Sequence, residues 1–190
     1  MIKNAHLTQQ LAYFRQFFCA PRTFGTLVPS SPWLCQRMVN QADWPHALSV
    51  AELGAATGVL TRRILRHMRA DARLDAYEIA PDFVRILEKN ADTRLNVVAQ
   101  SAEHLRCRYD VIFSCLPLLS IPAPVSVRIL RQARASLNPG GVMIQFQYSP
   151  MSEKLLSRYF EWEKVYEMRN FPPAWVYICT PRDDERQKVA

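Results

Sequence analysis

Apolar and polar positions along this chain follow two alternating patterns, which together predict an α/β fold. From residue 48 onward, short apolar runs of strand length alternate with segments in which apolar residues recur at helical spacing. Strands are predicted at 48–53, 74–79, 95–99, 109–116, 142–148, 165–168 and 175–179. Helices are predicted at 3–19, 32–40, 58–68, 81–90, 123–137 and 151–160. Apolar strands that alternate with helices indicate a mostly parallel sheet with helices on both faces.

The two ends of the chain add features that the alternating middle lacks. The last two predicted strands follow one another closely, as in a hairpin, so we expect an antiparallel strand near one edge of a seven-stranded sheet. Near the other end, Ser31 can cap a helix that Pro32 begins. We expect N-terminal helices over 1–42, one α/β domain over 43–182 and a charged tail over 183–190.

Composition agrees with a globular domain and disfavours several other classes. The 190 residues carry a net charge of +7 and five cysteines, of which no two form a C-x-x-C pair. This cysteine pattern disfavours a disulfide framework or a zinc site, so we expect no metal and a reducing cytosol. The first ten residues lack the apolar region of a signal peptide. Three prolines interrupt the uncharged run 111–127, which therefore does not predict a membrane span.

The strongest chemical signal is the turn after the first predicted strand, from Glu52 to Gly58 (ELGAATG). Glycines at such a junction let the backbone turn tightly and approach a ligand at the carboxyl end of the sheet. One strand later stands Glu78, whose carboxylate can accept hydrogen bonds from both hydroxyls of a ribose. A dinucleotide fingerprint is absent, because residue 59 is valine where G-x-G-x-x-G requires glycine.

These residues resemble the class I S-adenosylmethionine-dependent methyltransferases, which have a Rossmann-like fold. Ala56 replaces the middle glycine of the family pattern, and its methyl group is expected to crowd the methionine carboxylate or to force a negative φ. Ser101 and Ala80 stand where relatives commonly carry acids. The resemblance assigns cofactor binding to ten residues: Glu52, Gly54, Ala56, Thr57, Gly58, Glu78, Ile79, Ser101, Ala102 and Cys115.

A narrower resemblance follows from five short motifs in a fixed order: 18–25 (FCAPRTFG), 29–31 (PSS), 116–122 (LPLLSIP), 145–150 (QFQYSP) and 170–174 (NFPPA). In this order they look like the small bacterial phospholipid N-methyltransferases, which convert phosphatidylethanolamine stepwise to phosphatidylcholine. The resemblance implies S-adenosylmethionine as cofactor, a phospholipid as substrate, and methyl transfer to an amine nitrogen. It places Tyr148 near the transferred methyl group as the candidate catalytic residue, and assigns substrate contacts to Leu116, Pro117, Tyr148 and Tyr177.

Two other functions remain open at this point. A ribosomal RNA adenine methyltransferase would have the same fold, and arginines 62, 63, 66, 69 and 73 could contact phosphates. The residues from Cys115 to Leu118 nevertheless lack the Asn and the aromatic ring with which such enzymes hold a flipped base, so we do not expect nucleic acid as a partner. The other alternative is a degenerate member that binds membranes with weak or no catalysis.

The expected partner is an anionic membrane surface. The segment 3–19 has an apolar stripe at helical spacing and only positive charges, as in an interfacial helix. Its members are Leu7, Leu11, Phe14 and Phe18 in the stripe, with Lys3 and Arg15 as the charges. The same helix could instead pack on the core as a lid over the cofactor. We expect a cytoplasmic protein that is peripheral on the inner face of the membrane.

Overall fold

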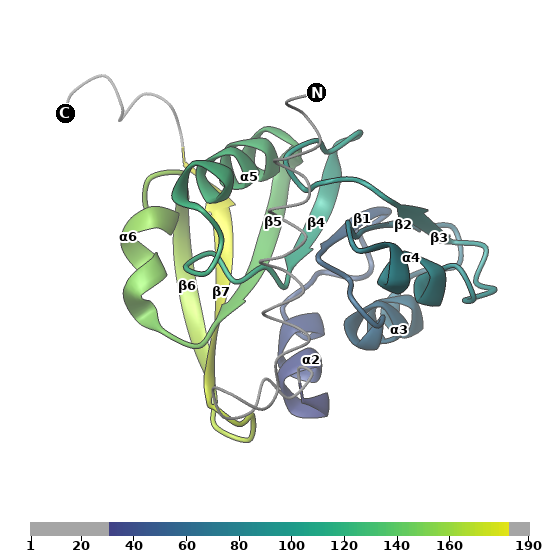
Figure 1. Cartoon of the computed structure of the whole chain (residues 1–190), viewed down its shortest axis with the longest axis horizontal. Helices are drawn as coiled ribbons and strands as arrows, with labels where there is room; N and C mark the ends of the chain where they lie inside the picture. Colours follow the sequence, from purple (N-terminus) through teal and green to yellow (C-terminus); the bar gives the residue numbers. More distant parts are fainter. Residues whose placement is uncertain (1–30, 183–190) are drawn as a thin grey trace.

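The computed structural model describes residues 31–182, and these are organised around a seven-stranded sheet (Figure 1). The strand order is β3-β2-β1-β4-β5-β7-β6. The strands are β1 (Ser49–Leu53), β2 (Arg73–Tyr77), β3 (Leu95–Val98), β4 (Tyr109–Ser114), β5 (Leu137–Gln147), β6 (Phe160–Glu167) and β7 (Ala174–Pro181). The helices are α2 (Pro32–Val39), α3 (Val59–His67), α4 (Pro81–Leu87), α5 (Ala123–Ala135) and α6 (Glu153–Leu156), with a 3₁₀ turn η1 at Pro150–Ser152.

The direction of the strands confirms the predicted Rossmann-like α/β class. Strands β1 to β5 are mutually parallel, and β7 runs antiparallel to both of its neighbours, β5 and β6. Strand β1 lies between β2 and β4, so the chain reverses its direction of travel across the sheet at that strand. Ligands of open α/β sheets bind at the carboxyl ends of strands at such a reversal.

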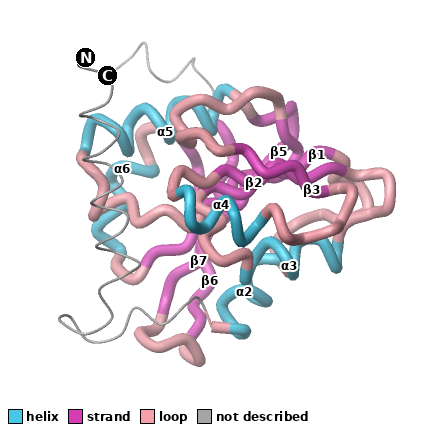
Figure 2. Tube along the Cα trace, turned by 45° about the vertical axis from the view of Figure 1, so that its right-hand side comes forward, coloured by secondary structure: helices cyan, strands magenta, loops and turns pink. Residues whose placement is uncertain are grey.

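Helices cover both faces of the sheet, with α2, α3 and α4 on one side and α5 and α6 on the other (Figure 2). The alternation of side chains in β1 shows how the two layers are separated. Val50 belongs to the core that includes Ile64 of α3, whereas Leu53 belongs to the core that includes Ile129 of α5. Continuous apolar strands therefore supply both cores, as expected for a sheet buried on two sides.

The start of α2 confirms the predicted cap. The Ser31 hydroxyl accepts a 3.2 Å hydrogen bond from the Leu34 backbone N–H, and Pro32 is the first helical residue. This arrangement satisfies one of the N–H groups that a helix start leaves unpaired.

Two predicted boundaries were wrong for identifiable reasons. The run 138–141 (NPGG) was expected to separate α5 from a strand at 142, but β5 already begins at Leu137. Gly140 has a φ of +78°, and the pairing register between β4 and β5 shifts next to it, so the glycines form an irregularity inside the strand. A Cβ at Gly141 would lie 2.9 Å from the Asn138 carbonyl oxygen, which explains the requirement for glycine there.

The predicted helix 151–160 is shorter, because its last part belongs to a strand. Helix α6 ends at Leu156, and β6 begins at Phe160, five residues before the predicted strand at 165. Residues 160–162 place a buried Phe160, an exposed Glu161 and a half-buried Trp162 in alternation, which is a strand pattern. Phe160 was therefore wrongly included in the predicted helix.

The predicted helix 3–19 and the charged tail 183–190 lie outside the described residues. Within 31–182, no helix combines the length and the apolar character needed to cross a bilayer.

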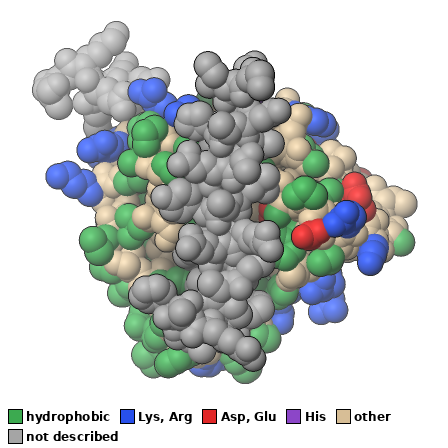
Figure 3. All heavy atoms as spheres, in the orientation of Figure 1, with side chains coloured by type: hydrophobic (Ala, Val, Ile, Leu, Met, Phe, Trp, Pro, Cys, Tyr) green, Lys and Arg blue, Asp and Glu red, His purple; other side chains and the backbone are tan. Residues whose placement is uncertain are grey.

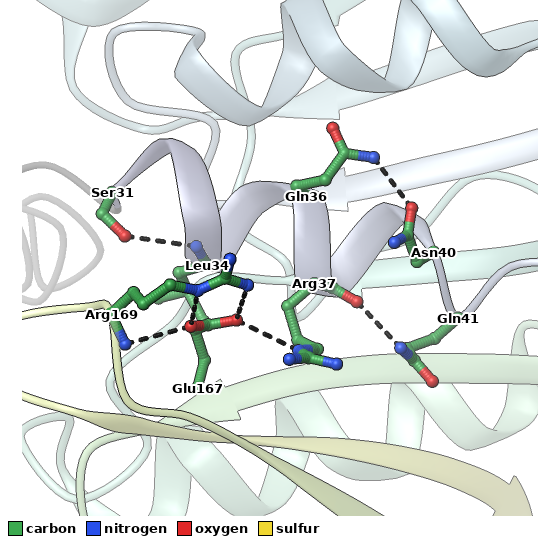
Figure 4. A network of polar contacts seen from close by, with 8 residues as sticks. All are labelled: Ser31, Leu34, Gln36, Arg37, Asn40, Gln41, Glu167 and Arg169. Atoms are coloured by element: carbon green, nitrogen blue, oxygen red, sulfur yellow. Dashed lines mark hydrogen bonds and ion pairs between the residues drawn. The ribbon is translucent and has the colours of Figure 1, made fainter.

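A buried carboxylate ties the β6–β7 hairpin to α2. Glu167, at the end of β6, is 1% exposed and accepts hydrogen bonds from Arg37 Nε at 3.1 Å and from Arg169 Nε at 2.9 Å (Figure 4). The Arg169 backbone N–H also donates to Glu167, at 3.0 Å. These hydrogen bonds, led by that from the Arg169 side chain, lower the pKa of Glu167 to about 2. The network fixes the turn 168–173 relative to α2.

Replacing Glu167 with glutamine should therefore destabilise the fold. We expect Glu167→Gln to lower the free energy of unfolding at pH 7 by about 1.5–3 kcal/mol, the contribution of hydrogen bonds to a charged group. Because the folded pKa is depressed, this contribution is complete above the ordinary glutamate pKa and is lost as the pH falls from about 5 towards 2. Urea unfolding at several pH values measures both effects. Glu163→Gln, an exposed change on the same strand, is the control, and equal effects of the two would contradict the prediction.

Candidate functional site

A pocket opens at the carboxyl ends of β1, β2 and β4, where the sequence places its glycine turn and its second acid. Six of the predicted site residues line this pocket: Gly54, Glu78, Ile79, Ser101, Ala102 and Leu116. They come from four separate segments of the chain, which the parallel strands bring to one edge. The main prediction about the location of the site is thus consistent with the geometry.

Sequence reasoning missed four other residues of the lining: Tyr77, Gln100, Val125 and Ile129. Tyr77 is buried and its hydroxyl lies 2.8 Å from that of Tyr109, while it also accepts the Arg106 backbone N–H at 2.9 Å. Its hydroxyl thereby holds the segment that follows Ser101 and Ala102. The only available signal was the position of Tyr77 directly before Glu78.

Gly54 is required because the backbone and the side chain of Leu116 approach each other closely. Its φ is +77°, and a Cβ there would lie 2.7 Å from Leu116 Cδ2. The sequence predicted that the glycine lets the backbone approach a ligand closely. The structure shows that the neighbour is also a protein side chain, which forms one wall of the pocket.

The prediction of a negative φ at Ala56 was wrong. Ala56 has a φ of +47°, the left-handed region that glycine favours, so the turn takes a glycine-like conformation despite the methyl group. Its backbone N–H donates a 2.9 Å hydrogen bond to Glu78 Oε2, which helps to hold it there. The methyl group costs conformational strain and does not redirect the turn.

Glu78 is the polar centre of the pocket. It is 3% exposed, and burial raises its pKa. Its carboxylate accepts three backbone N–H groups, those of Ile79 and Ala80 at 2.8 Å on Oε1 and that of Ala56 at 2.9 Å on Oε2. A carboxylate offers about four acceptor positions, so one position, on Oε2, remains for a ligand hydroxyl. The expected hydrogen bonds to a ribose stay a prediction.

Glu52 points away from the pocket, towards α3. It is 1% exposed and accepts a 2.6 Å hydrogen bond from the Thr61 hydroxyl. Burial raises the pKa of Glu52 to about 8. Thr57 is exposed, with its carbonyl bonded to Arg62, and Gly58 takes a φ of +76° before α3. The cofactor roles of these residues stay predictions.

The loop after β4 is held by two glutamines that sequence reasoning noted only as part of a motif. Gln145 Nε2 and Gln147 Nε2, both on β5, donate to the Leu116 carbonyl oxygen at 3.1 and 2.9 Å. Both amides are buried, so both acceptor positions of this carbonyl are used inside the protein. The pair fixes the backbone whose side chain closes over Gly54.

The remaining predicted residues lie around this loop on opposite faces of the sheet. Tyr148 is half-buried on the α2 face, with its ring edge-on to Phe146 at 5.4 Å, and burial raises its pKa. Tyr177 is fully buried on the α6 face. Cys115 belongs to the same side as Tyr148, and burial raises the pKa of its thiol. Pro117 is half-buried and accepts the Ser120 N–H. Their roles stay predictions, since no bound molecule defines them.

The pocket has the chemistry that an adenosine moiety requires. Glu78 supplies an acceptor for a ribose hydroxyl, and Ile79, Ala102, Leu116 and Ile129 supply apolar surface for a purine. An acid lies next to Ser101, because the Ser101 hydroxyl donates a 3.1 Å hydrogen bond to the Glu103 carboxylate. The residues therefore fit S-adenosylmethionine. Within 31–182, no three histidine, cysteine or acidic side chains gather as metal ligands would.

Comparison with known proteins points in the same direction. Residues 50–141 match a protein family described as a methyltransferase domain. The chain is also similar to the ornithine lipid N-methyltransferase of Singulisphaera acidiphila. The two are 32% identical over 179 residues, which cover 88% of this chain and 93% of the relative.

Solved structures show the same fold. The N-methyltransferase NodS from Bradyrhizobium japonicum, in complex with S-adenosyl-L-homocysteine, superposes with a TM-score of 0.68 at 12% identity and covers 91% of this chain and 98% of its own. The 1,6-didemethyltoxoflavin-N1-methyltransferase from Burkholderia thailandensis has a TM-score of 0.67 at 17% identity, with coverages of 93% and 90%.

Restoring glycine at position 56 should stabilise the protein. Removing the left-handed strain gains about 1–2 kcal/mol, and the more flexible unfolded chain costs about 0.4–1 kcal/mol. We therefore expect Ala56→Gly to raise the free energy of unfolding by about 0.5–1 kcal/mol in urea denaturation, with affinity for S-adenosylhomocysteine unchanged or increased. Ala55→Gly, at a neighbouring buried site without positive φ, should lower the free energy of unfolding. If both substitutions changed the free energy of unfolding in the same direction and by the same amount, Ala56 would not be strained.

Removing the carboxylate at position 78 should weaken cofactor binding. We expect Glu78→Ala to lower the affinity for S-adenosylhomocysteine by about 1–3 kcal/mol in calorimetry, the cost of losing hydroxyl partners. Glu78→Gln, which keeps one acceptor oxygen and the side-chain size, should lose less. Glu88→Ala on the exposed end of α4 is the control. Unchanged affinity in a folded Glu78→Ala protein would remove Glu78 from the cofactor site.

Proposed function

Since the chain belongs to the class I S-adenosylmethionine-dependent methyltransferases, we propose that it methylates the amine of a membrane-lipid headgroup, with phosphatidylethanolamine as the first acceptor. The relative from Singulisphaera acidiphila bears the name of an enzyme for another amine-bearing lipid. The motifs of this chain favour the phospholipid. Both acceptors share a primary amine on a water-insoluble molecule, and the experiment below separates them.

The observation that carries the proposal is a set of exposed apolar side chains beyond the carboxyl ends of the strands, which we name the apolar rim. Four large side chains of the rim are exposed, namely Leu119 at 50%, Met151 at 77%, Met168 at 74% and Phe171 at 73%. They follow the carboxyl ends of β4, β5 and β6. These ends lie on the same side of the sheet, because β6 runs parallel to β5. Hydrophobic side chains gather at the lower end of the face in Figure 3, where Figure 1 places the β6–β7 turn. Such a surface suits contact with lipid.

Positive charge accompanies the rim. The Arg169 guanidinium carbon lies 4.4 Å above the ring of Trp33, which is itself 51% exposed. Arg169 shares the buried Glu167 carboxylate with Arg37, so the turn carries one carboxylate between two guanidinium groups. Apolar and cationic side chains in one place favour an anionic membrane surface, which supports a peripheral, cytoplasmic location.

The chemistry asked of the protein is mainly positioning. S-adenosylmethionine supplies a methyl group that is already activated by its sulfonium. The chain must orient an amine nitrogen towards it and exclude water, which is a task for the rigid loop that Gln145 and Gln147 hold. The acceptor amine must first be neutral. No histidine of residues 31–182 stands at the carboxyl end of a strand, and Tyr148 remains the polar candidate near the acceptor.

The adenine methyltransferase alternative has weaker support. The Leu116 carbonyl, in the run Cys115 to Leu118, already accepts two amide hydrogen bonds and has no acceptor position left for a base amine. Arg62 and Arg69 bond backbone carbonyls, and Arg69 also pairs with Asp71. The degenerate alternative rests on three departures from the family pattern, at Ala56, Ser101 and Ala80. At Ala56 the backbone nevertheless takes a positive φ and donates to Glu78.

The proposal is tested with purified protein, labelled S-adenosylmethionine and three acceptors: vesicles with phosphatidylethanolamine, vesicles with ornithine lipid, and ribosomal RNA. We expect label in the methylated phospholipid. Leu119→Ser should raise the vesicle concentration for half-maximal rate about tenfold, because one large apolar side chain no longer enters the lipid.

Leu48→Ser is the matched control. Leu48 is 46% exposed, which is similar to Leu119. It precedes β1 and so lies at the amino-terminal ends of the parallel strands, opposite to Leu119. Equal effects of the two substitutions would exclude the rim as the lipid-facing surface. Labelled RNA without labelled lipid would overturn the proposed function. Label in ornithine lipid alone would show that ornithine lipid, and not phosphatidylethanolamine, is the acceptor.

A further inference from the structure

Lys164 projects from the middle of β6 into an aromatic and acidic surrounding. Its Nζ lies 4.3 Å from the ring centroid of Trp175 and 5.7 Å from that of Trp162. The same ammonium donates a 2.8 Å hydrogen bond to Glu153 Oε1, at the start of α6. We name these four residues, Glu153, Trp162, Lys164 and Trp175, the Lys164 cluster. Neither the cofactor pocket nor the apolar rim uses it.

The walls of the cluster are held by bonds that do not involve the lysine. Trp162 Nε1 donates to the Ser157 hydroxyl at 2.9 Å, which fixes the indole ring. The buried Tyr177 hydroxyl donates to Glu153 Oε1 at 2.9 Å, which fixes the carboxylate. A cation-binding site would therefore remain if the lysine side chain turned away.

The set of groups is one that recognises alkylated ammonium ions. Tryptophan faces attract a cation through the ring quadrupole. A carboxylate adds a negative charge, which attracts an ammonium ion even when that ion has no N–H group to donate. The cluster is also open, because the side chain of Lys164 is 33% exposed and that of Glu153 is 26% exposed. An ammonium group from outside can compete with the lysine for the same place.

The cluster is linked to the pocket through β7 and β5. In the antiparallel pairing of β5 with β7, Trp175 is opposite Gln147. Gln147 donates to the carbonyl of Leu116, whose side chain lines the pocket beside Gly54. A single row of contacts thus connects the cluster to the wall of the cofactor pocket.

We propose that the Lys164 cluster binds the ammonium group of a methylated lipid headgroup, which displaces Lys164 Nζ from Trp175 and Glu153. The displaced lysine supplies a positive charge for the phosphate or carboxylate that such zwitterionic headgroups also carry. The ligand class is an alkylated ammonium, free or lipid-borne. This inference rests on the proposed function for its physiological ligand, but its test is a direct binding measurement.

The test uses the full chain and follows the tryptophan indole N–H signals by NMR during titration with tetramethylammonium chloride, with sodium chloride as the ionic-strength control. Lys164→Met should bind tetramethylammonium about tenfold more tightly than the wild type, because the internal competitor is gone. Lys154→Met removes an exposed lysine from the neighbouring helix and should behave as the wild type. Adding Trp175→Leu to Lys164→Met should abolish the gain.

Phosphocholine provides the second arm, because it carries the anion as well. The wild type should prefer phosphocholine to tetramethylammonium, and Lys164→Met should lose that preference. Equal binding of tetramethylammonium by the wild type, Lys164→Met and the Trp175→Leu double variant, all shown to be folded by thermal unfolding, would overturn the proposal. If the wild type binds these ammonium ions but methylates no lipid, only the proposed function is refuted. If it methylates lipid but does not bind them at the Lys164 cluster, only the binding role of the cluster is refuted.

Discussion

The site depends on one buried carboxylate whose negative charge is compensated by backbone N–H groups. Glu78 accepts from the turn after β1 through Ala56 and from the start of α4 through Ile79 and Ala80. The bonds join two segments that the strands alone would leave independent. They hold Ala56 in a left-handed conformation that its side chain disfavours, and they leave one acceptor position towards the pocket. These bonds therefore fix the backbone on both sides of Glu78.

Much of this architecture could be predicted from the chain. The glycine turn and Glu78 stand at strand ends, and strand periodicity is enough to bring strand ends together. The direction of side chains was harder to predict. Glu52 turns to Thr61 and away from the pocket, because alternate residues of a strand face opposite sides of the sheet. The φ of Ala56 was mispredicted because its stabilising partner is 22 residues away. The start of β5 was missed because Gly140 and Gly141 look like a helix end in isolation.

Strands β6 and β7 carry the residues to which we assign the acceptor. Strand β7 brings Trp175 and Tyr177 next to the glutamines that hold Leu116, and β6 adds Lys164 and the turn with Phe171. The glycine turn that carries the resemblance belongs to the pocket, whereas Trp175, Lys164 and Phe171 lie outside it. The glycine turn therefore specifies the cofactor more sharply than it specifies the substrate.

Strand β6 forms one edge of the sheet, and its outward backbone groups could pair with another molecule. Its middle carries Glu161, Glu163 and Lys164, all exposed, and charges in such positions oppose the addition of a further strand. The opposite edge, β3, has only four residues and offers little to pair with. A protein that gathers at a lipid surface reaches high local concentration, where edge-to-edge aggregation is a hazard. The charges on β6 thus protect the protein at the membrane surface on which we propose that it acts.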